Sequence, residues 1–228
     1  MIPILRGDRP VDRLLNFSDA VVAVAITILA LPLVDIGGPQ EGQTVWAVLH
    51  GHYGQILNFA STFLVVGMLW TVHNRIMNCL DAYDGTVFWL NMLWLIGFVF
   101  LPWPSSMFSG GEDVNSSAAG AFHSDGTGVL YWMTLAYISL MGSIMSLYIA
   151  RNLDLVNPGD RNYVSSLRRA RGRWRGLTFF FIFVIAALLT LIYSWLGFFA
   201  LFLIIPARRF LDVKAEEQPT KNDGETTP

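Results

Sequence analysis

The feature that most constrains this chain is a series of apolar runs, each about as long as a helix that crosses a lipid bilayer. An α-helix rises 1.5 Å per residue, so roughly 20 apolar residues span the hydrocarbon core. Of the 228 residues, 54% are hydrophobic and only 14% are charged. A soluble domain usually has about a quarter of its residues charged. The sequence therefore predicts an all-α membrane protein with several spans.

We expect six transmembrane helices, over residues 14–34, 54–78, 86–108, 127–150, 174–192 and 194–207. The last two form nearly one apolar run, which is long for one span and short for two. Charge decides between these readings, because with six spans all 15 Lys and Arg residues lie on one side of the membrane. The loops 35–52 and 109–126 then contain Asp and Glu but no Lys or Arg. The positive-inside rule places both termini in the cytoplasm.

We assign residues 1–211 to one six-helix transmembrane domain and the polar residues 212–228 to a disordered cytoplasmic tail. The first apolar run follows three arginines, as in a signal peptide, but no small-residue cleavage site closes it, so we expect a retained helix. The single cysteine, Cys79, excludes an intrachain disulfide. The basic run 168–176 lies between two spans, which predicts contact with anionic membrane lipids rather than nucleic acid.

The first span has two unlike faces when successive residues are placed 100° apart. Its apolar stripe consists of Phe17, Ala20, Val24, Ile28 and Leu31, with Thr27 at the edge. Ser18 and Asp19 project away from that stripe. A carboxylate at membrane depth costs about 2.5–3.5 kcal/mol on insertion scales unless it finds a partner. Candidate partners at the same depth of the next two spans are Trp70, His73, Asn74 and Asn91.

Two interpretations of these polar residues stay open at this point. The first is a buried network that holds the helices in register. The second is a proton- or ion-sensing site in which His73 is the titratable member.

The same residues resemble a known family. Arg13, Phe17-Ser18-Asp19-Ala20, Thr27 and Leu31-Pro32 are similar to the first helix of the transmembrane protein 175 family of potassium channels, which is marked by its FSD motif. Further on, the chain resembles the family's second and third helices at Trp70, His73, the pair Leu90-Asn91 and the pair Leu101-Pro102. With one six-helix repeat, the chain resembles the bacterial members.

The resemblance implies a homotetramer in which the first helix of each subunit lines a central pore. By position, the apolar constrictions are Val24, Ile28 and Leu31, and Thr27 supplies a hydroxyl that favours K⁺. Arg13, Phe17, Ser18, Asp19, Trp70, His73 and Asn91 are then expected to form the FSD motif and the network that braces this helix. Because the chain has no Thr-Val-Gly-Tyr-Gly loop, we expect the apolar rings to gate by dewetting.

The resulting hypothesis is a potassium-preferring cation channel of the bacterial inner membrane. Its partners are its own copies, membrane lipids, and K⁺ and other monovalent cations, without a cofactor or bound metal. The alternatives are a secondary transporter and a proton-coupled or proton-leak membrane protein. An enzyme is not expected, since Ser18 and Asp19 are adjacent on a helix and one His cannot bridge them, and no Gly-x-Ser-x-Gly or His-Glu-x-x-His motif occurs.

Overall fold

The long apolar runs form long helices, as the hydropathy pattern predicts. The computed structural model describes residues 5–6, 8–110, 126–167, 170–192, 196–197 and 199. Its long helices are α1 (Asp8–Leu29), α4 (Tyr53–Met77), α5 (Gly85–Phe100), α7 (Thr127–Arg151) and α9 (Ala170–Thr190). Within the described residues four segments are long and apolar enough to cross a membrane: Pro10–Val34, Tyr53–Met77, Gly85–Phe108 and Thr127–Arg151. The protein is therefore a multi-pass membrane protein.

The predicted fifth and sixth spans are described unequally. The fifth falls in α9, whose apolar part, Leu177–Thr190, is shorter than the other spans. The predicted span 194–207 lies outside the described residues except for 196–197 and 199, and so does the predicted tail 212–228.

Two of the spans are interrupted by proline. The helix α2 (Leu31–Val34) follows α1 after a break at Ala30, and α6 (Pro102–Gly110) follows α5 after Leu101. A proline lacks the N–H that would donate to the carbonyl four residues earlier, so a helix is commonly broken or kinked there. Pro32 and Pro102 stand at the two breaks.

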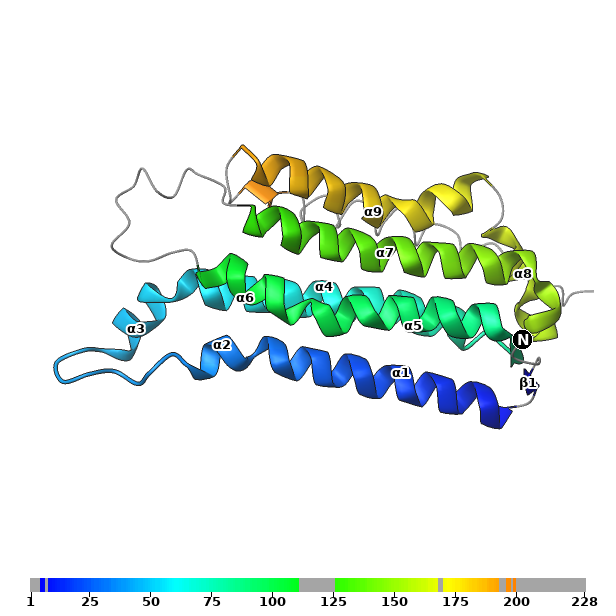
Figure 1. Ribbon diagram of the computed structural model, residues 1–228, viewed down its shortest axis with the longest axis horizontal. Helices are drawn as coiled ribbons and strands as arrows, with labels where there is room; N and C mark the ends of the chain where they lie inside the picture. Colours follow the sequence, from blue (N-terminus) through cyan, green and yellow to red (C-terminus); the bar gives the residue numbers. More distant parts are fainter. Residues whose placement is uncertain are drawn as a thin grey trace, which may run out of the picture.

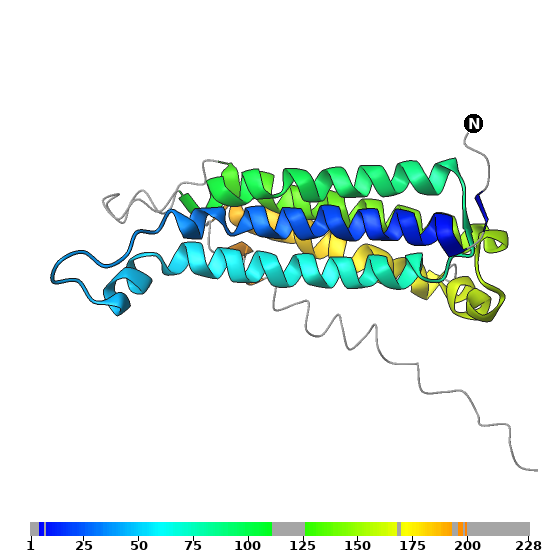
Figure 2. The ribbon, with the colours of Figure 1, turned by 90° about the horizontal axis from the view of Figure 1, so that it is seen from below.

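The helices lie in three layers (Figure 1). One layer consists of α1 and α2, the middle layer of α4 with α5 and α6, and the third of α7 and α9. Seen from below, α1 lies over the space between α4 and α5 (Figure 2), and it contacts both. The main core fills the space between the layers and includes Trp94, Phe98, Tyr131, Trp132 and Phe183.

One end of the bundle has short elements that the sequence did not predict. Strand β1 (Leu5–Arg6) pairs antiparallel with β2 (Ala82–Tyr83) in the α4–α5 connection. The same connection is bonded to the segment after α7, because the Asn157 amide donates to the Cys79 carbonyl over 2.9 Å. That segment contains η2 (Leu153–Leu155), η3 (Pro158–Asp160) and α8 (Arg161–Ser166). The beginning of α1 is thereby tied to two other helix connections.

The same end also holds the free cysteine and a capping carboxylate. Asp84 Oδ1 accepts from the Val87 amide at 2.9 Å and so caps the first turn of α5, while Asp84 Oδ2 accepts from the Tyr148 hydroxyl at 2.5 Å. Cys79 is buried, and burial raises the pKa of its thiol, with the carboxylate of Asp160 adding to the rise. Because the thiolate is the reactive form, this cysteine is expected to react slowly. At the opposite end, α3 (Val45–Gly51) is capped by the Thr44 hydroxyl.

Candidate functional site

The face of α1 that points away from α4 and α5 is apolar and exposed. Val24 is 57% exposed, Leu31 is 56% exposed, and Ile28 and Thr27 are also exposed. The other side of the helix is buried against the rest of the subunit, at Val22, Ala25 and Leu29. We call the exposed set Val24, Thr27, Ile28 and Leu31 the α1 stripe. It is a continuous apolar surface that no other described segment covers, interrupted only by one hydroxyl.

That hydroxyl has a fixed direction. Thr27 Oγ1 donates to the Val24 carbonyl one turn earlier over 2.7 Å. Because its proton is used within the helix, the oxygen presents its lone pairs toward the exposed side. A hydroxyl held in this way can accept a hydrogen bond from water or contact a cation, but it does not offer a donor to an anion.

The opposite face of α1 is held by a buried chain of hydrogen bonds. Ser18 is 1% exposed, and its hydroxyl donates to the Leu14 carbonyl at 2.9 Å. The Asn91 amide nitrogen of α5 donates to Ser18 Oγ at 2.8 Å, and Asn91 Oδ1 lies 2.9 Å from His73 Nε2 of α4. Three helices are thus joined by consecutive side chains in an apolar interior, where such bonds are strong and leaving one unmade is costly.

The order of these bonds assigns the His73 tautomer. Since the Ser18 proton goes to Leu14, Ser18 Oγ must accept from Asn91, and the amide oxygen of Asn91 then faces His73. His73 Nε2 therefore carries the proton. Its Nδ1 is buried and has no hydrogen-bond partner among the described residues. The ring stacks on Trp94 of α5, with ring centroids 3.7 Å apart and an interplanar angle of 9°.

Asp19 has its own partner on α4. The Trp70 indole nitrogen donates to Asp19 Oδ1 over 2.7 Å, and both side chains are half-buried. Asp19 of the FSD motif is thus hydrogen-bonded to α4, and Ser18 of the same motif is hydrogen-bonded to α5.

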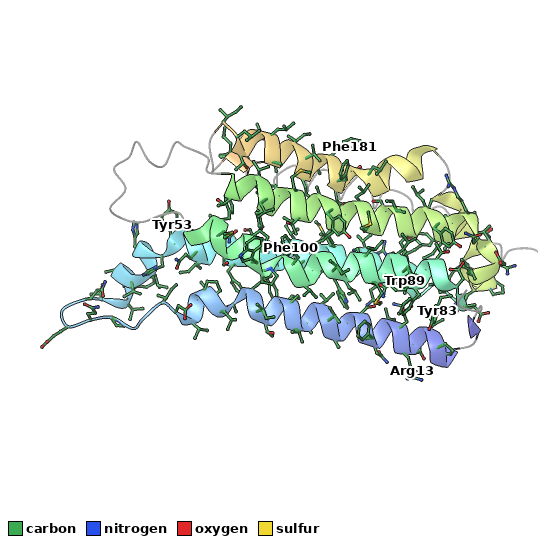
Figure 3. The ribbon with its side chains drawn as sticks, viewed as in Figure 1. Arg13, Tyr53, Tyr83, Trp89, Phe100 and Phe181 are labelled. Atoms are coloured by element: carbon green, nitrogen blue, oxygen red, sulfur yellow. The ribbon has the colours of Figure 1, made fainter. Side chains whose placement is uncertain are left out.

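The structure does not bring the other predicted bracing residues into this network. Phe17 lies one residue from Ser18, on the exposed side of α1, and is itself exposed. Arg13 is exposed one turn earlier, where it points away from the bundle (Figure 3). The helical rotation of about 100° per residue separates Phe17 from Ser18. Asn74, another candidate partner, accepts at both its oxygens from the Asn78 amide, outside the network.

Sequence reasoning missed a second polar cluster at the other end of the bundle. Asn58 Nδ2 of α4 donates to the Ser105 carbonyl of α6 at 3.0 Å, and the Thr62 hydroxyl lies 2.8 Å from the Tyr131 hydroxyl of α7. Thr62 also donates to the Asn58 carbonyl. An amide inside an apolar span was the available signal, because such a group needs a partner. Within the described residues, no group of three or more His, Cys, Asp or Glu side chains could hold a metal ion.

Comparison with known proteins finds one family that the first part of the chain resembles. Residues 13–102 match the model of the family described as endosomal/lysosomal potassium channel TMEM175. A protein of Streptomyces collinus named as a potassium channel is 32% identical over 128 residues, which are 54% of this chain and 59% of that protein. Over these residues the chain is similar to the TMEM175 family. The resemblance predicted from the FSD motif is thereby confirmed.

The relatives of this chain carry two kinds of name. The human endosomal/lysosomal proton channel TMEM175 is 29% identical over 103 residues, which are 45% of this chain and 20% of that protein. The match thus spans about three-fifths of the length of the Streptomyces relative and a fifth of the human one.

The fold also matches a solved family structure over nearly all of both chains. The crystal structure of a lysosomal potassium-selective channel TMEM175 homolog from Chamaesiphon minutus superposes with a TM-score of 0.67 at 22% identity. It covers 90% of this chain and 97% of that one. The shared fold extends to the part of the chain beyond residue 102, where the family model does not match.

Proposed function

We propose that this protein is a potassium-preferring cation channel, formed by four identical subunits whose α1 helices line a central pore. The observation that carries the proposal is the division of α1 into two faces. Its exposed face is the α1 stripe, while its other face is locked into the subunit by Ser18 and Asp19. One face of α1 is hydrogen-bonded to the rest of the subunit and the other is uncovered. Such a helix is suited to line a pore together with the α1 helices of other copies.

The apolar side chains of the α1 stripe supply the constrictions of the pore. Four copies of Val24, Ile28 or Leu31 around an axis form narrow apolar rings that exclude water when they are close together. The pore then conducts when the rings move apart enough to keep an ion partly hydrated. Thr27 lies between these rings, and its outward lone pairs give a passing cation a polar contact.

The surfaces beside the stripe support the assembly of four copies. An open apolar groove of about 680 Å³ lies between α1 and α5–α6 and is lined by residues that include Phe17, Val21, Ile96, Phe100 and Trp103. On the other flank of α1, the outer side of α4 carries exposed Leu57 and Leu64. When four α1 helices surround an axis, the α5 flank of one subunit meets the α4 flank of the next. The groove is assigned to that neighbour.

The remaining features of the proposal follow the charge pattern. Six spans per subunit, with 194–207 as the last, place both termini and all Lys and Arg residues on the cytoplasmic side. Membrane lipids contact the outer helices, and the protein needs no cofactor beyond the permeant ion. We place it in the inner membrane of a bacterium.

Proton conduction is the second candidate. The observation that favours it is the human relative, which is named as a proton channel and matches 45% of this chain. A narrow apolar pore that admits a few water molecules can pass protons as well as alkali cations. The two functions can be told apart, because K⁺ flux and proton flux through the same pore are measured separately.

The experiment is ion flux into liposomes from the purified protein, with the subunit number measured by native mass. The fluxes of K⁺, Na⁺ and Cs⁺ are compared. A K⁺ flux greater than the Na⁺ flux, together with a tetrameric mass, supports the proposal. A pH-sensitive dye in the same liposomes measures proton flux under a K⁺-free gradient. Saturable flux coupled to a second solute indicates a transporter, and a monomeric mass with no flux overturns the channel.

A further inference from the structure

The outer part of the stripe contains a backbone oxygen that has lost its helical partner. In an α-helix each carbonyl accepts from the N–H four residues later. The residue four after Ile28 is Pro32, which has no N–H. Two neighbouring amides donate to other carbonyls, Ala30 to that of Thr27 at 3.2 Å and Leu33 to that of Ala30 at 3.0 Å. The hydrogen-bond ladder is interrupted at Ala30, but the backbone of Ala30 stays in the right-handed helical region (φ −82°, ψ −12°), so the helical register continues into α2.

The position of this oxygen follows from the direction of helical carbonyls. A carbonyl points along the helix axis toward the residue four positions later, so the Ile28 oxygen faces the break between Ile28 and Pro32. The side chains that flank it, Ile28 and Leu31, are both exposed members of the α1 stripe. The oxygen therefore lies on the open face of the helix rather than against α4 or α5.

A carboxylate lies two turns farther along the same face. Asp35 ends α2 as its C-cap and is exposed. The short helix α2 continues the line of α1 (Figures 1 and 2). Seven residues of α-helix bring Asp35 back to within about 20° of Ile28, roughly 10 Å along the axis. With the α1 orientation given above, Asp35 lies at the outer end of the pore.

We propose that these two groups form a cation-binding vestibule at the outer mouth of the pore, an inference that rests on the proposed function. Four Asp35 carboxylates gather monovalent cations at the entrance. Four Ile28 carbonyl oxygens then replace part of the water shell of the ion before it meets the apolar ring of Val24. Broken helices in membrane transporters use freed carbonyls on cations in the same manner. The ligand class is a weakly hydrated monovalent cation such as K⁺ or Rb⁺.

The first test restores the missing donor. Pro32→Ala gives residue 32 an N–H that can bond the Ile28 carbonyl and withdraw it from the ion. We expect the ratio of K⁺ to Na⁺ flux in liposomes to fall about two- to tenfold, the range that one net hydrogen-bond-sized interaction corresponds to. The control is Pro102→Ala, which makes the same chemical change where the carbonyl four residues earlier belongs to buried Phe98. An unchanged ratio in Pro32→Ala overturns the carbonyl site.

The second test removes the charge and does not depend on the break. Asp35→Asn is expected to lower K⁺ flux about two- to threefold at about 0.02 M KCl and to have no effect near 1 M, where the screening length is about 3 Å. The control is Glu41→Gln, an exposed acid in the same connection but outside the α1–α2 register. Equal flux in Asp35→Asn and the wild type at low salt overturns the entrance ring.

The two proposals fail in different ways. A wild-type protein that gives neither K⁺ flux nor a tetrameric mass contradicts the proposed function itself. A wild type that conducts, with both variants indistinguishable from it, leaves the channel in place and removes only the vestibule. Rb⁺ anomalous scattering from crystals of the tetramer gives a readout without flux, and a peak on the axis at the level of residue 28 supports the site.

Discussion

The side-chain amide nitrogen of Asn91 lies 2.8 Å from the hydroxyl oxygen of Ser18, across the contact between α5 and α1. Asn91 also holds His73 of α4 through its other amide atom, at 2.9 Å. A rotation of α1 about its axis would break the first bond inside an apolar interior, where an unpaired polar group is costly. The bond therefore fixes which residues of α1 are exposed, and the orientation of the α1 stripe depends on it.

Replacing Asn91 by leucine tests this dependence. Asn91→Leu keeps a similar volume but leaves Ser18 and His73 without their partner, so we expect the folded state to lose about 1–3 kcal/mol. The thermal midpoint of the purified protein in detergent measures the loss. The matched control is Asn78→Ala, which removes an exposed amide at the end of α4. Equal midpoints for the two variants would show that the buried network does not hold the helices.

The bond between Trp70 and Asp19 gives a second test. Trp70→Phe keeps most of the ring but removes the donor, and Asp19→Ala leaves the indole N–H unpaired, so both are expected to lower the fraction of assembled tetramer. Asp19→Asn keeps an acceptor oxygen and should fall between them and the wild type. Native mass spectrometry measures the assembled fraction. The control is Trp46→Phe, an exposed tryptophan of α3 outside the groove, and an equal loss there would contradict a specific role for the bond.

The helices and the orientation of α1 could be predicted from sequence because each depends on a repeated pattern. Hydropathy located α4, α7 and the span formed by α5 and α6 within a few residues, since a span needs a long apolar run. The rotation of 100° per residue placed Ser18 opposite Val24. Ser18 is indeed buried and Val24 exposed in the structure.

Single contacts left no such pattern. The β1–β2 pair is two residues long on each side, and its pairing depends on where the chain ends of two helices meet. The stacking of His73 on Trp94 and the bond from Asn58 to Ser105 join residues from different helices. No periodic pattern in the sequence predicts such pairs. We expected Arg13 and Phe17 to help brace α1, but both lie on the exposed side of the helix, because a resemblance in sequence does not say which way a side chain points.

Accessibility to water distinguishes a pore-lining stripe from one that faces lipid. Val24→Cys is expected to react with a water-soluble thiosulfonate in the membrane and to lose K⁺ flux, whereas Ala25→Cys, buried one residue away, should not react. The native Cys79 interferes little, because burial raises the pKa of its thiol and leaves less thiolate at neutral pH. Labelling of Val24→Cys only by a lipid-soluble reagent would move α1 to the outside of the assembly.

The apolar rings predict a leak when they are made smaller. Val24→Ala and Leu31→Ala each remove bulk from an exposed position of the stripe, which widens a ring and lets water remain in it. We expect a higher resting flux of K⁺ and a smaller preference over Na⁺ in liposomes. Leu188→Ala, at an exposed position of α9, is the control of equal size for Leu31→Ala. Unchanged flux in both stripe variants would remove these residues from the pore.

Two Gly→Ala substitutions distinguish the effect of close helix packing on stability from the effect of helix propensity. They are at Gly97, which is crowded, and at Gly67, which is open. A Cβ at Gly97 of α5 would lie 2.5 Å from Ile138 Cγ1 and 3.1 Å from Tyr137 Cδ1, both on α7. The Tyr137 ring has little freedom to move, since its hydroxyl donates to the Leu93 carbonyl at 2.9 Å. Gly97→Ala should therefore cost about 1–3 kcal/mol through overpacking. Gly67 of α4 has nothing within 4 Å of such a Cβ, so Gly67→Ala should be neutral or stabilise by up to about 1 kcal/mol. Thermal midpoints in detergent measure both, and a Gly97→Ala midpoint at or above that of Gly67→Ala would contradict the close contact of α5 with α7.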